Sequence, residues 1–235
     1  MYDIEFNGET CEMHGTYIRQ RPNITVPLEE VEQYRVAGRD GVLTGSRYIP
    51  PMDLYIPMNF RVNKDLNEEW QARFRDLRTW LHGSGEMIQS DDDSYYLKVL
   101  NVQIEESERI IKKYGRFTAH FTCDPYFYRI DGKEEYDITH PRILDNEYDI
   151  SHPTYVFSGS SGTRTLTVNG NAVSIVVNGT TMIDTDRMIT YTTSDMKLRN
   201  TRLTGDYEDL YLKPGENTIT ATGTGLKIIP NWRTR

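Results

Sequence analysis

The residues best suited to chemistry are three consecutive aspartates, Asp91, Asp92 and Asp93. Carboxylate oxygens are the hard ligands that calcium and magnesium prefer, so this run invites a divalent-cation site. A calcium-binding EF-hand loop spaces its ligands and adds a distal glutamate, and the run has neither feature. Consecutive residues of a strand also point to opposite faces, so three adjacent carboxylates do not converge on one ion. The run therefore predicts a solvated turn before a strand, and we assign no metal-binding residue.

The histidines also form no recognisable site. None of them belongs to an H-x-x-x-H or H-E-x-x-H pair, the spacings that place two imidazoles on one side of a helix. Two of them precede a proline, which restricts the histidine to extended backbone. We interpret the His-Pro histidines as linker residues, and we expect no ligand or catalyst among the five, which are His14, His82, His120, His140 and His152.

Signatures of a nucleophile or a phosphate loop are missing as well. The sequence has no G-x-S-x-G elbow and no catalytic cysteine motif. Gly159 to Gly162 lacks the glycine spacing and the lysine of a phosphate-binding loop. Cys11 and Cys123 lie far apart and fit no metal spacing, and we favour two buried thiols over a disulfide. We therefore predict that the protein is not an enzyme and needs no cofactor.

Composition places the chain among globular proteins. Its 235 residues suffice for two domains, and 37% of them are hydrophobic. The net charge of −8 makes nucleic-acid binding a poor expectation, because acidic chains gain nothing from counterion release. The sequence shows no secretory signal and no apolar run long enough to span a bilayer, so we expect a protein made in the cytoplasm with no membrane partner.

Period-two patterns dominate the first half of the chain. Asn7-Gly8 is a hairpin signal, because these residues tolerate the positive φ angles of a tight turn. Residues 28–36 alternate imperfectly and lead into a second turn at Gly38 to Gly41. Residues 53–62 alternate well, and Pro57 inside them predicts an edge position or a bulge. The side chains expected on the buried face of this strand are Leu54, Ile56, Met58 and Phe60.

One helix interrupts these strands. Asn67 is the expected N-cap, and Glu68 and Glu69 follow it in the first turn, where the helix dipole favours negative charge. An apolar stripe at helical spacing predicts packing against a sheet, and it consists of Trp70, Phe74, Leu77 and Leu81. Further strands are expected over 95–105 and 116–122, and the aromatic run 126–128 predicts strand-end or interdomain packing more than sugar stacking.

The second half of the chain differs in composition. Residues 133–153 are charged, show little periodicity and predict a linker or an extended crossover. From Thr154 onward, short strands alternate with turns rich in Gly, Asn, Ser and Thr, which predicts an antiparallel sandwich over 154–235. The sequence thus predicts a mainly β protein with an N-terminal domain over 1–132 that carries one helix and a hairpin.

Several motifs together resemble the distal tail protein family of siphoviruses that infect Gram-positive bacteria. In the N-terminal half the matching motifs are Gly38-Arg39-Asp40-Gly41, Leu77-Arg78-Thr79-Trp80-Leu81, and the segment from Phe117 to Tyr128 that resembles F-x-C-x-P-Y-x-Y. In the C-terminal half they are Pro153 to Gly159, Ile183-Asp184, Leu210, the turn Pro214 to Ile219, and Pro230 to Arg233. The resemblance covers nearly the full length in the order that the family shows.

This resemblance implies a structural role at the tip of a bacteriophage tail. The N-terminal domain would be a sandwich-like ring-forming domain, and the C-terminal domain would be a galectin-like sandwich. Six copies would form a ring, alone or as two stacked rings, between the tail tube protein and the tail-associated lysin or fibre. Receptor-binding proteins are further candidate partners, and DNA would only pass through an acidic channel. The protein would be assembled in the host cytoplasm and located in the virion.

Two features of the sequence bear on how such a ring could form and on the alternative function. The strand 28–36 and the hairpin 86–105 offer edges that a neighbouring copy could extend by strand pairing. The alternative is a non-enzymatic carbohydrate-binding module for attachment to the host cell wall. Galectin-type lectins use a cluster of polar residues and a tryptophan on one sheet, whereas residues 154–235 contain no histidine and only Trp232.

Overall fold

The computed structural model describes residues 2–23, 26–62, 69–111 and 113–235. The chain divides into two compact units. The N-terminal unit comprises Met1–Phe127 and Arg235, and the C-terminal unit comprises Tyr128–Thr234. Among the described residues, no helix combines the length and the apolar character that crossing a membrane would require.

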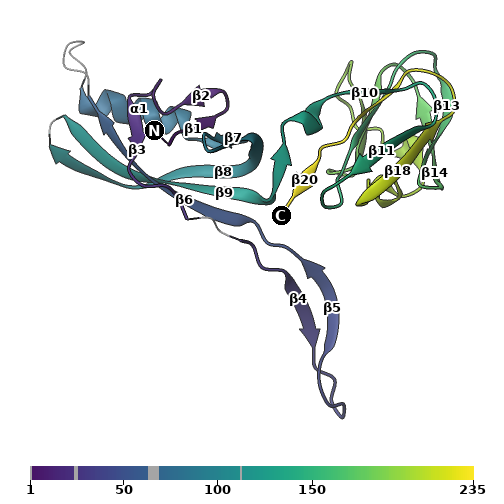
Figure 1. Ribbon diagram of the computed structural model, residues 1–235, viewed down its shortest axis with the longest axis horizontal. Helices are drawn as coiled ribbons and strands as arrows, with labels where there is room; N and C mark the ends of the chain where they lie inside the picture. The colour runs from purple at the N-terminus through teal and green to yellow at the C-terminus, as the bar shows by residue number, and fades with distance from the viewer. Residues whose placement is uncertain (1, 24–25, 63–68, 112) are drawn as a thin grey trace. The chain divides into compact units, whose positions relative to one another are not determined.

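The N-terminal unit is built on one antiparallel sheet with the strand order β2-β1-β7-β8-β9-β6-β3 (Figure 1). Its strands are β1 (Ile4–Phe6), β2 (Glu9–Thr10), β3 (Thr16–Ile18), β6 (Met52–Arg61), β7 (Gly83–Gln89), β8 (Asp92–Ile111) and β9 (Tyr114–Arg129). The turn between β1 and β2 is the predicted Asn7-Gly8 turn, with φ angles of 52° and 84°. The period-two patterns of the sequence therefore specified the central strands correctly.

Helix α1 (Trp70–Trp80) packs on the apolar face of this sheet. The predicted stripe is correct, since Trp70, Leu77 and Leu81 are buried and Phe74 packs against the core. Trp80 joins it, and its indole Nε1 donates a 3.3 Å hydrogen bond to the Phe6 carbonyl oxygen. The N-cap is Glu69 in extended backbone, whereas the expected cap Asn67 and Glu68 lie outside the described residues.

Pro57 illustrates how β6 fits between two neighbours. Strand β6 lies inside the sheet between β9 and β3, so it is not an edge strand. Pairing with β3 ends at Ile18 and Met58, and the Arg19 backbone N–H then donates to the Pro57 carbonyl oxygen at 2.9 Å. In an antiparallel ladder, the backbone N–H and C=O of one residue point to the same neighbouring strand. The N–H that Pro57 lacks would therefore point toward Arg19, which lies beyond the end of β3. The ladder with β9 stays intact, and the expected edge character is local to this position.

A separate two-stranded sheet is formed by β4 (Glu30–Tyr34) and β5 (Leu43–Tyr48) (Figure 1). We call residues 30–48 the arm. Its strands pair only with each other, and the turn between them contains Gly38 and Gly41, both with φ near 81° as the turn prediction requires. Every residue of β5 is exposed. The arm therefore lacks a core of its own within the described part of the chain.

The C-terminal unit is a sandwich of two five-stranded antiparallel sheets, which confirms the predicted fold class. One sheet has the order β10-β19-β12-β15-β16, and its strands are β10 (Tyr136–Ile138), β19 (Leu226–Ile229), β12 (Thr154–Phe157), β15 (Thr181–Asp184) and β16 (Ile189–Thr192). The other has the order β11-β18-β13-β14-β17, with β11 (Arg142–Asn146), β18 (Gly215–Ala221), β13 (Gly162–Val168), β14 (Asn171–Val177) and β17 (Leu203–Thr204). Inward side chains of both sheets form one core.

Shorter elements complete this unit. Three single-turn 3-10 helices lie at Asp131–Lys133, Asn200–Arg202 and Tyr207–Leu210, and β20 (Arg233–Thr234) pairs with β9. The segment 133–153, expected as a linker or crossover, differs from that expectation because it contains β10 and β11. Each of these strands forms the edge of a sandwich sheet, and Ile138 and Leu144 enter the core. Charged residues mask the pattern, since only one face of each short strand is buried.

Candidate functional site

The polar face of the N-terminal sheet carries a network centred on His120. Strand β9 alternates, with Phe117, Ala119 and Phe121 buried, so His120 points outward. Its Nε2 lies 2.8 Å from Asp53 Oδ1, and its ring stacks on Tyr55 with centroids 4.4 Å apart. The hydrogen bond with His120 lowers the pKa of Asp53, as does one donated by Thr122. The network orders the outward face of neighbouring strands.

A second histidine, His14, holds the loop before β3 in place. His14 lies between Glu9 and Asp76 at 2.7 and 3.2 Å, and its ring stacks on Trp80 with centroids 4.4 Å apart. The loop before β3 is thereby attached to α1. Sequence reasoning missed this site, because residues 9, 14 and 76 become neighbours only through the fold.

His152 corrects the interpretation of the His-Pro pairs as linkers. Its Nδ1 lies 3.0 Å from Asp186 Oδ1, and Arg233 Nη2 lies 2.9 Å from its Nε2. The ring stacks on Tyr211 with centroids 4.0 Å apart. These contacts tie β20 to the residues that precede β12, so His152 belongs to the sandwich. His140 lies exposed in the turn between β10 and β11.

The remaining candidates for chemistry occupy unreactive positions. Cys11 and Cys123 are free and buried, and burial raises the pKa of the Cys123 thiol to about 12. A thiol with a raised pKa is a poor nucleophile at neutral pH. The aspartate run lies at the turn between β7 and β8, where Asp92 already begins β8. No group of three His, Cys, Asp or Glu side chains in the described part of the chain could hold a metal ion.

The N-terminal sheet has unpaired strand edges, which another chain could contact. The expected open edge along 86–105 is wrong over most of its length, because β7 pairs with β1 and β8 pairs with β7 on one side and β9 on the other. Pairing of β8 with β7 ends at Val102, so within the described sheet β8 has no strand partner on that side from Gln103 onward. Among the described strands, β2 and β3 lie at the two ends of this strand order.

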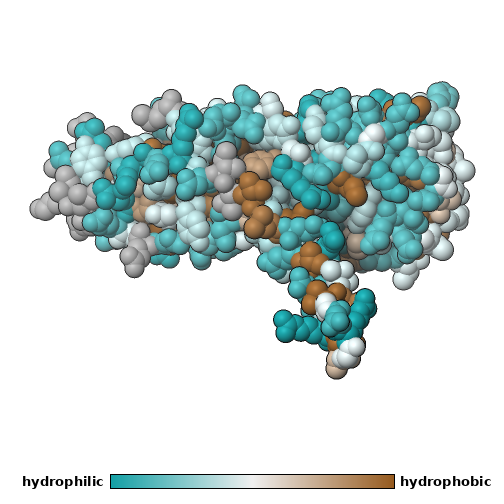
Figure 2. All heavy atoms as spheres, turned by 60° about the horizontal axis from the view of Figure 1, so that its bottom comes forward, coloured by the Kyte–Doolittle hydropathy of each residue, from teal (hydrophilic) through white to brown (hydrophobic). Residues whose placement is uncertain are grey.

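The arm is the largest unpartnered element. Figure 2 shows hydrophobic side chains interspersed with hydrophilic ones over its surface. The exposed hydrophobic residues of the arm are Tyr34, Val36, Val42, Leu43 and Tyr48. An isolated two-stranded hairpin is at best marginally stable in water, and exposed apolar clusters mark interaction surfaces. The arm therefore has the properties of an element that is covered by another chain.

Two glutamates of β4 accept hydrogen bonds from hydroxyl groups of both strands of the arm. Glu32 accepts hydrogen bonds from Ser46 Oγ at 2.6 Å and from the Tyr34 hydroxyl at 2.7 Å, and Tyr48 donates to Glu30. The bonds from Ser46 and Tyr34 lower the pKa of Glu32, and the bond to Glu32 raises the pKa of Tyr34. Both shifts favour a carboxylate facing neutral hydroxyl groups. The network thus holds the two strands together at neutral pH.

We expect the arm to open at acid pH. A carboxyl whose folded pKa is lowered stabilises the fold above its ordinary value of about 4.3, and this contribution is lost as the pH falls through the lowered pKa. Hydrogen exchange of the arm amides, corrected for intrinsic rates, should therefore accelerate below about pH 4 while strand β18 stays protected. A Glu32→Ala variant should exchange fast in the arm already at pH 7. Arm protection that does not change between pH 7 and pH 3 would contradict the role of Glu32.

The C-terminal sandwich lacks an exposed indole. Trp232 is 8% exposed and belongs to the core of the sandwich, and its backbone nitrogen lies 2.6 Å from where a Cβ on Gly132 would be. Sugar-binding sites of galectin type stack a pyranose on an open aromatic ring, which this tryptophan does not offer. The aromatic run 126–128 is likewise committed to packing, since Tyr128 is buried and Phe127 contacts the N-terminal core.

The chain is similar to the Dit protein of phage SPP1, which is described as a paradigm of the hub adsorption apparatus in phages that infect Gram-positive bacteria. The two share 17% identity with a TM-score of 0.67 over 97% of each chain. The expected fold is thus confirmed across both units.

A second solved structure shows the same fold. A chain of the phage P2 baseplate, in its activated conformation with calcium, matches with 11% identity and a TM-score of 0.53 over 100% of this chain and 97% of the other. No protein-family model matches the sequence, and no curated protein matches it.

Proposed function

We propose that this protein is a structural, non-enzymatic distal tail protein that forms a ring at the tip of a bacteriophage tail. The observation that carries the proposal is the match to the SPP1 hub protein over 97% of both chains, which includes both units in the same order. The buried thiols and the packed histidines supply no reactive group that would argue for catalysis.

The ring is proposed to contain six copies. Closed rings form from head-to-tail contacts between two different surfaces of each copy. The N-terminal unit offers such surfaces in its arm and in the open side of β8 from Gln103 onward. The polar face of the sheet would then face the channel. Its charges are mixed, with Asp53, Glu105 and Asp124 beside Lys98, Arg116 and His120.

The proposed neighbours are the tail tube protein on one side and the tail-associated lysin or fibre on the other, with receptor-binding proteins as further candidates. The protein would reside in the virion after assembly in the host cytoplasm, and DNA would cross only its channel. A carbohydrate-binding role for the sandwich is the weaker alternative, because Trp232 is buried. Binding of the intact protein in a glycan screen would favour that alternative.

The solution mass of the purified protein tests the ring. Light scattering coupled to size exclusion should give six times the 27.4 kDa chain mass, or twice that value for two stacked rings. Negative-stain electron microscopy of the same fraction should show particles with a central opening. A trimer or another closed number would overturn the sixfold ring. A monomer at every concentration would show that the chain does not form a ring by itself.

A further inference from the structure

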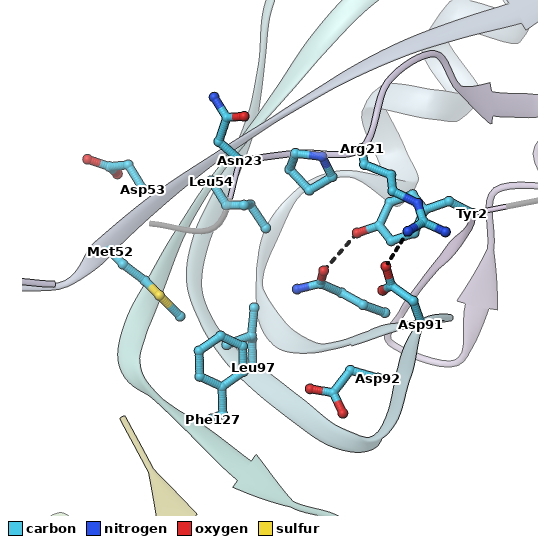
Figure 3. Close-up of a pocket in the computed structure, with 12 residues that line it drawn as sticks. Tyr2, Arg21, Asn23, Met52, Asp53, Leu54, Asp91, Asp92, Leu97 and Phe127 are labelled. Atoms are coloured by element: carbon cyan, nitrogen blue, oxygen red, sulfur yellow. Dashed lines mark hydrogen bonds and ion pairs between the residues drawn. The ribbon is translucent and has the colours of Figure 1, made fainter. Parts of the chain in front are cut away.

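A cavity opens at one end of the apolar face of the N-terminal sheet. Its volume is about 440 Å³, within the range of sites that bind small ligands or protruding side chains. Figure 3 shows the residues around it, which come from the segment before β1, the segment after β3, the start of β6, the end of β7 with the following turn, β8 and the end of β9. The cavity lies wholly within the N-terminal unit and does not depend on the ring.

The floor of the cavity is apolar. Met52, Leu54 and Leu97 are buried core residues that turn part of their surface to it, and Phe127 packs beside them. Because this surface is open to the cavity, a methylene chain placed over it would remove apolar area from water, at roughly 0.8 kcal/mol per buried CH₂. The floor therefore favours an aliphatic group over a fully polar one.

The rim of the cavity is acidic, and one of its carboxylates already binds a cation of the same chain. The Arg21 guanidinium lies 3.5 Å from Asp91, and its Cζ lies 5.5 Å from the centre of the Tyr2 ring. Tyr2 is held in turn by a 2.8 Å hydrogen bond from its hydroxyl to Gln89. The chain's own cation thus binds at the rim through a carboxylate and an aromatic face, the two groups that attract guanidinium and ammonium ions.

Asp92 is the second acid of the rim, and it has no such cation. Among the described residues no hydrogen bond or ion pair reaches its carboxylate, and in Figure 3 it lies beside the cavity near Asp91, while the Asp53 carboxylate points away toward His120. Burial, followed by the charges of Asp91 and Asp93, raises the pKa of Asp92. A cation placed between Asp91 and Asp92 would favour the charged form of Asp92 and so offset both its burial and the neighbouring negative charges.

We propose that this cavity is a socket for a lysine or arginine side chain of another protein, with the aliphatic stem on Met52, Leu54 and Leu97 and the cationic head at Asp92 and Asp91. The occupant must be cationic at its tip and aliphatic along its length, because the rim of the cavity is acidic and its floor is apolar. A lysine or arginine side chain has this form, whereas a free diamine would place a second charge against the apolar floor.

Methyl NMR of the full-length protein tests the socket with a lysine model compound. Nα-acetyl-lysine N-methylamide should shift the methyl signals of Met52, Leu54 and Leu97, and the norleucine analogue, which lacks the ammonium group, should bind at least threefold more weakly. Asp92→Asn should weaken binding of the lysine compound by a similar factor. The matched control is Asp93→Asn, which removes the same charge from the adjacent residue of β8, whose side chain points to the opposite face.

Three outcomes would overturn the proposal. Equal binding of the lysine and norleucine compounds would show that the rim selects no cation. Equal loss in the Asp92→Asn and Asp93→Asn variants would assign the effect to the general negative field of the turn. Binding of putrescine as tight as that of the lysine compound would assign the cavity to a free diamine. None of these results depends on whether the chain forms a ring, so failure of the socket and failure of the ring are distinguishable.

Discussion

Replacing Phe60 with alanine is expected to destabilise the N-terminal unit by about 3–5 kcal/mol, the usual cost of removing a buried aromatic ring from a core. The Phe60 ring is fully buried and contacts the rings of Trp70, Phe74 and Phe117 at centroid distances of 5.3, 6.2 and 6.1 Å. It links β6 to α1 through Trp70 and Phe74, and it also packs on Phe117 of the neighbouring strand β9. Its loss therefore leaves a cavity between three elements that cannot all move inward.

Gly115 makes this site more sensitive to shape. Phe60 and Gly115 are cross-strand partners, and a Cβ on Gly115 would lie 2.2 Å from the Phe60 ring. The ring thus covers the glycine and shields its backbone, and no other residue fits opposite Phe60 without displacing it. This explains a glycine near the start of β9, where it would otherwise weaken the strand.

Urea unfolding followed by tryptophan fluorescence measures this effect. Trp70 and Trp80 report on the N-terminal unit and Trp232 reports on the sandwich. We expect Phe60→Ala to shift the N-terminal transition to lower urea and to leave the sandwich transition in place. Tyr55→Ala is the matched control, because Tyr55 lies on the same strand but is 48% exposed on the opposite face. Equal shifts in the two variants would contradict the assignment of Phe60 as the centre of this core.

The elements that the sequence specified are those whose burial follows a simple local period. In β6 and β9 every second residue is buried over a long stretch, so the pattern is strong enough to identify the strand and its inward face. The Asn7-Gly8 turn and the stripe of α1 are equally local signals. Each of them depends only on residues within a few positions, which a single sequence displays directly.

Strands β10 and β11 were missed because they are short and rich in charged residues, so their hydrophobic pattern is weak even though burial alternates along β11. The inward position of Asn146 is polar, and it is satisfied only because its side chain donates to the carbonyl oxygens of Asp149 and Leu212 at 2.9 and 3.1 Å. A buried asparagine with distant partners looks like a loop residue in the sequence. The hydrogen bond to Leu212 therefore stabilises an inward polar residue of β11 that the local sequence does not mark as part of a strand.

The positions of edges and of polar networks were not predictable for the same reason. The hairpin 86–105 loses its free edge because Ile4 pairs with Gln89, a partner far away in the chain. His120 finds Asp53 across 67 residues, and His14 finds Asp76 across 62. Such contacts are fixed by strand order, which one sequence without its fold does not reveal. Only the outward direction of His120 could have been derived from the alternation of β9.

Charged substitutions at the tip of the arm are expected to abolish the proposed ring without unfolding the monomer. Val36 and Val42 are 48% and 42% exposed beside the turn of the arm, so an aspartate at either site remains in water in the monomer. In a ring that covers the arm, both carboxylates would lose their contact with water and would have no cation to compensate them. Burying an unpaired charge costs several kcal/mol, so the Val36→Asp, Val42→Asp double variant should raise the concentration needed for assembly at least about 100-fold.

The measurement compares solution mass and thermal midpoint for three proteins. The double variant should elute as a monomer whose N-terminal unit still unfolds cooperatively, with a midpoint lowered only by the stabilisation that assembly gives the unmodified chain. Val176→Asp is the matched control, because Val176 is 45% exposed on the sandwich, outside the surfaces proposed to build the ring. It should keep the oligomer of the unmodified chain. If the double variant assembles as that chain does, the arm does not build the ring, and the open side of β8 becomes the remaining candidate for the contact between copies.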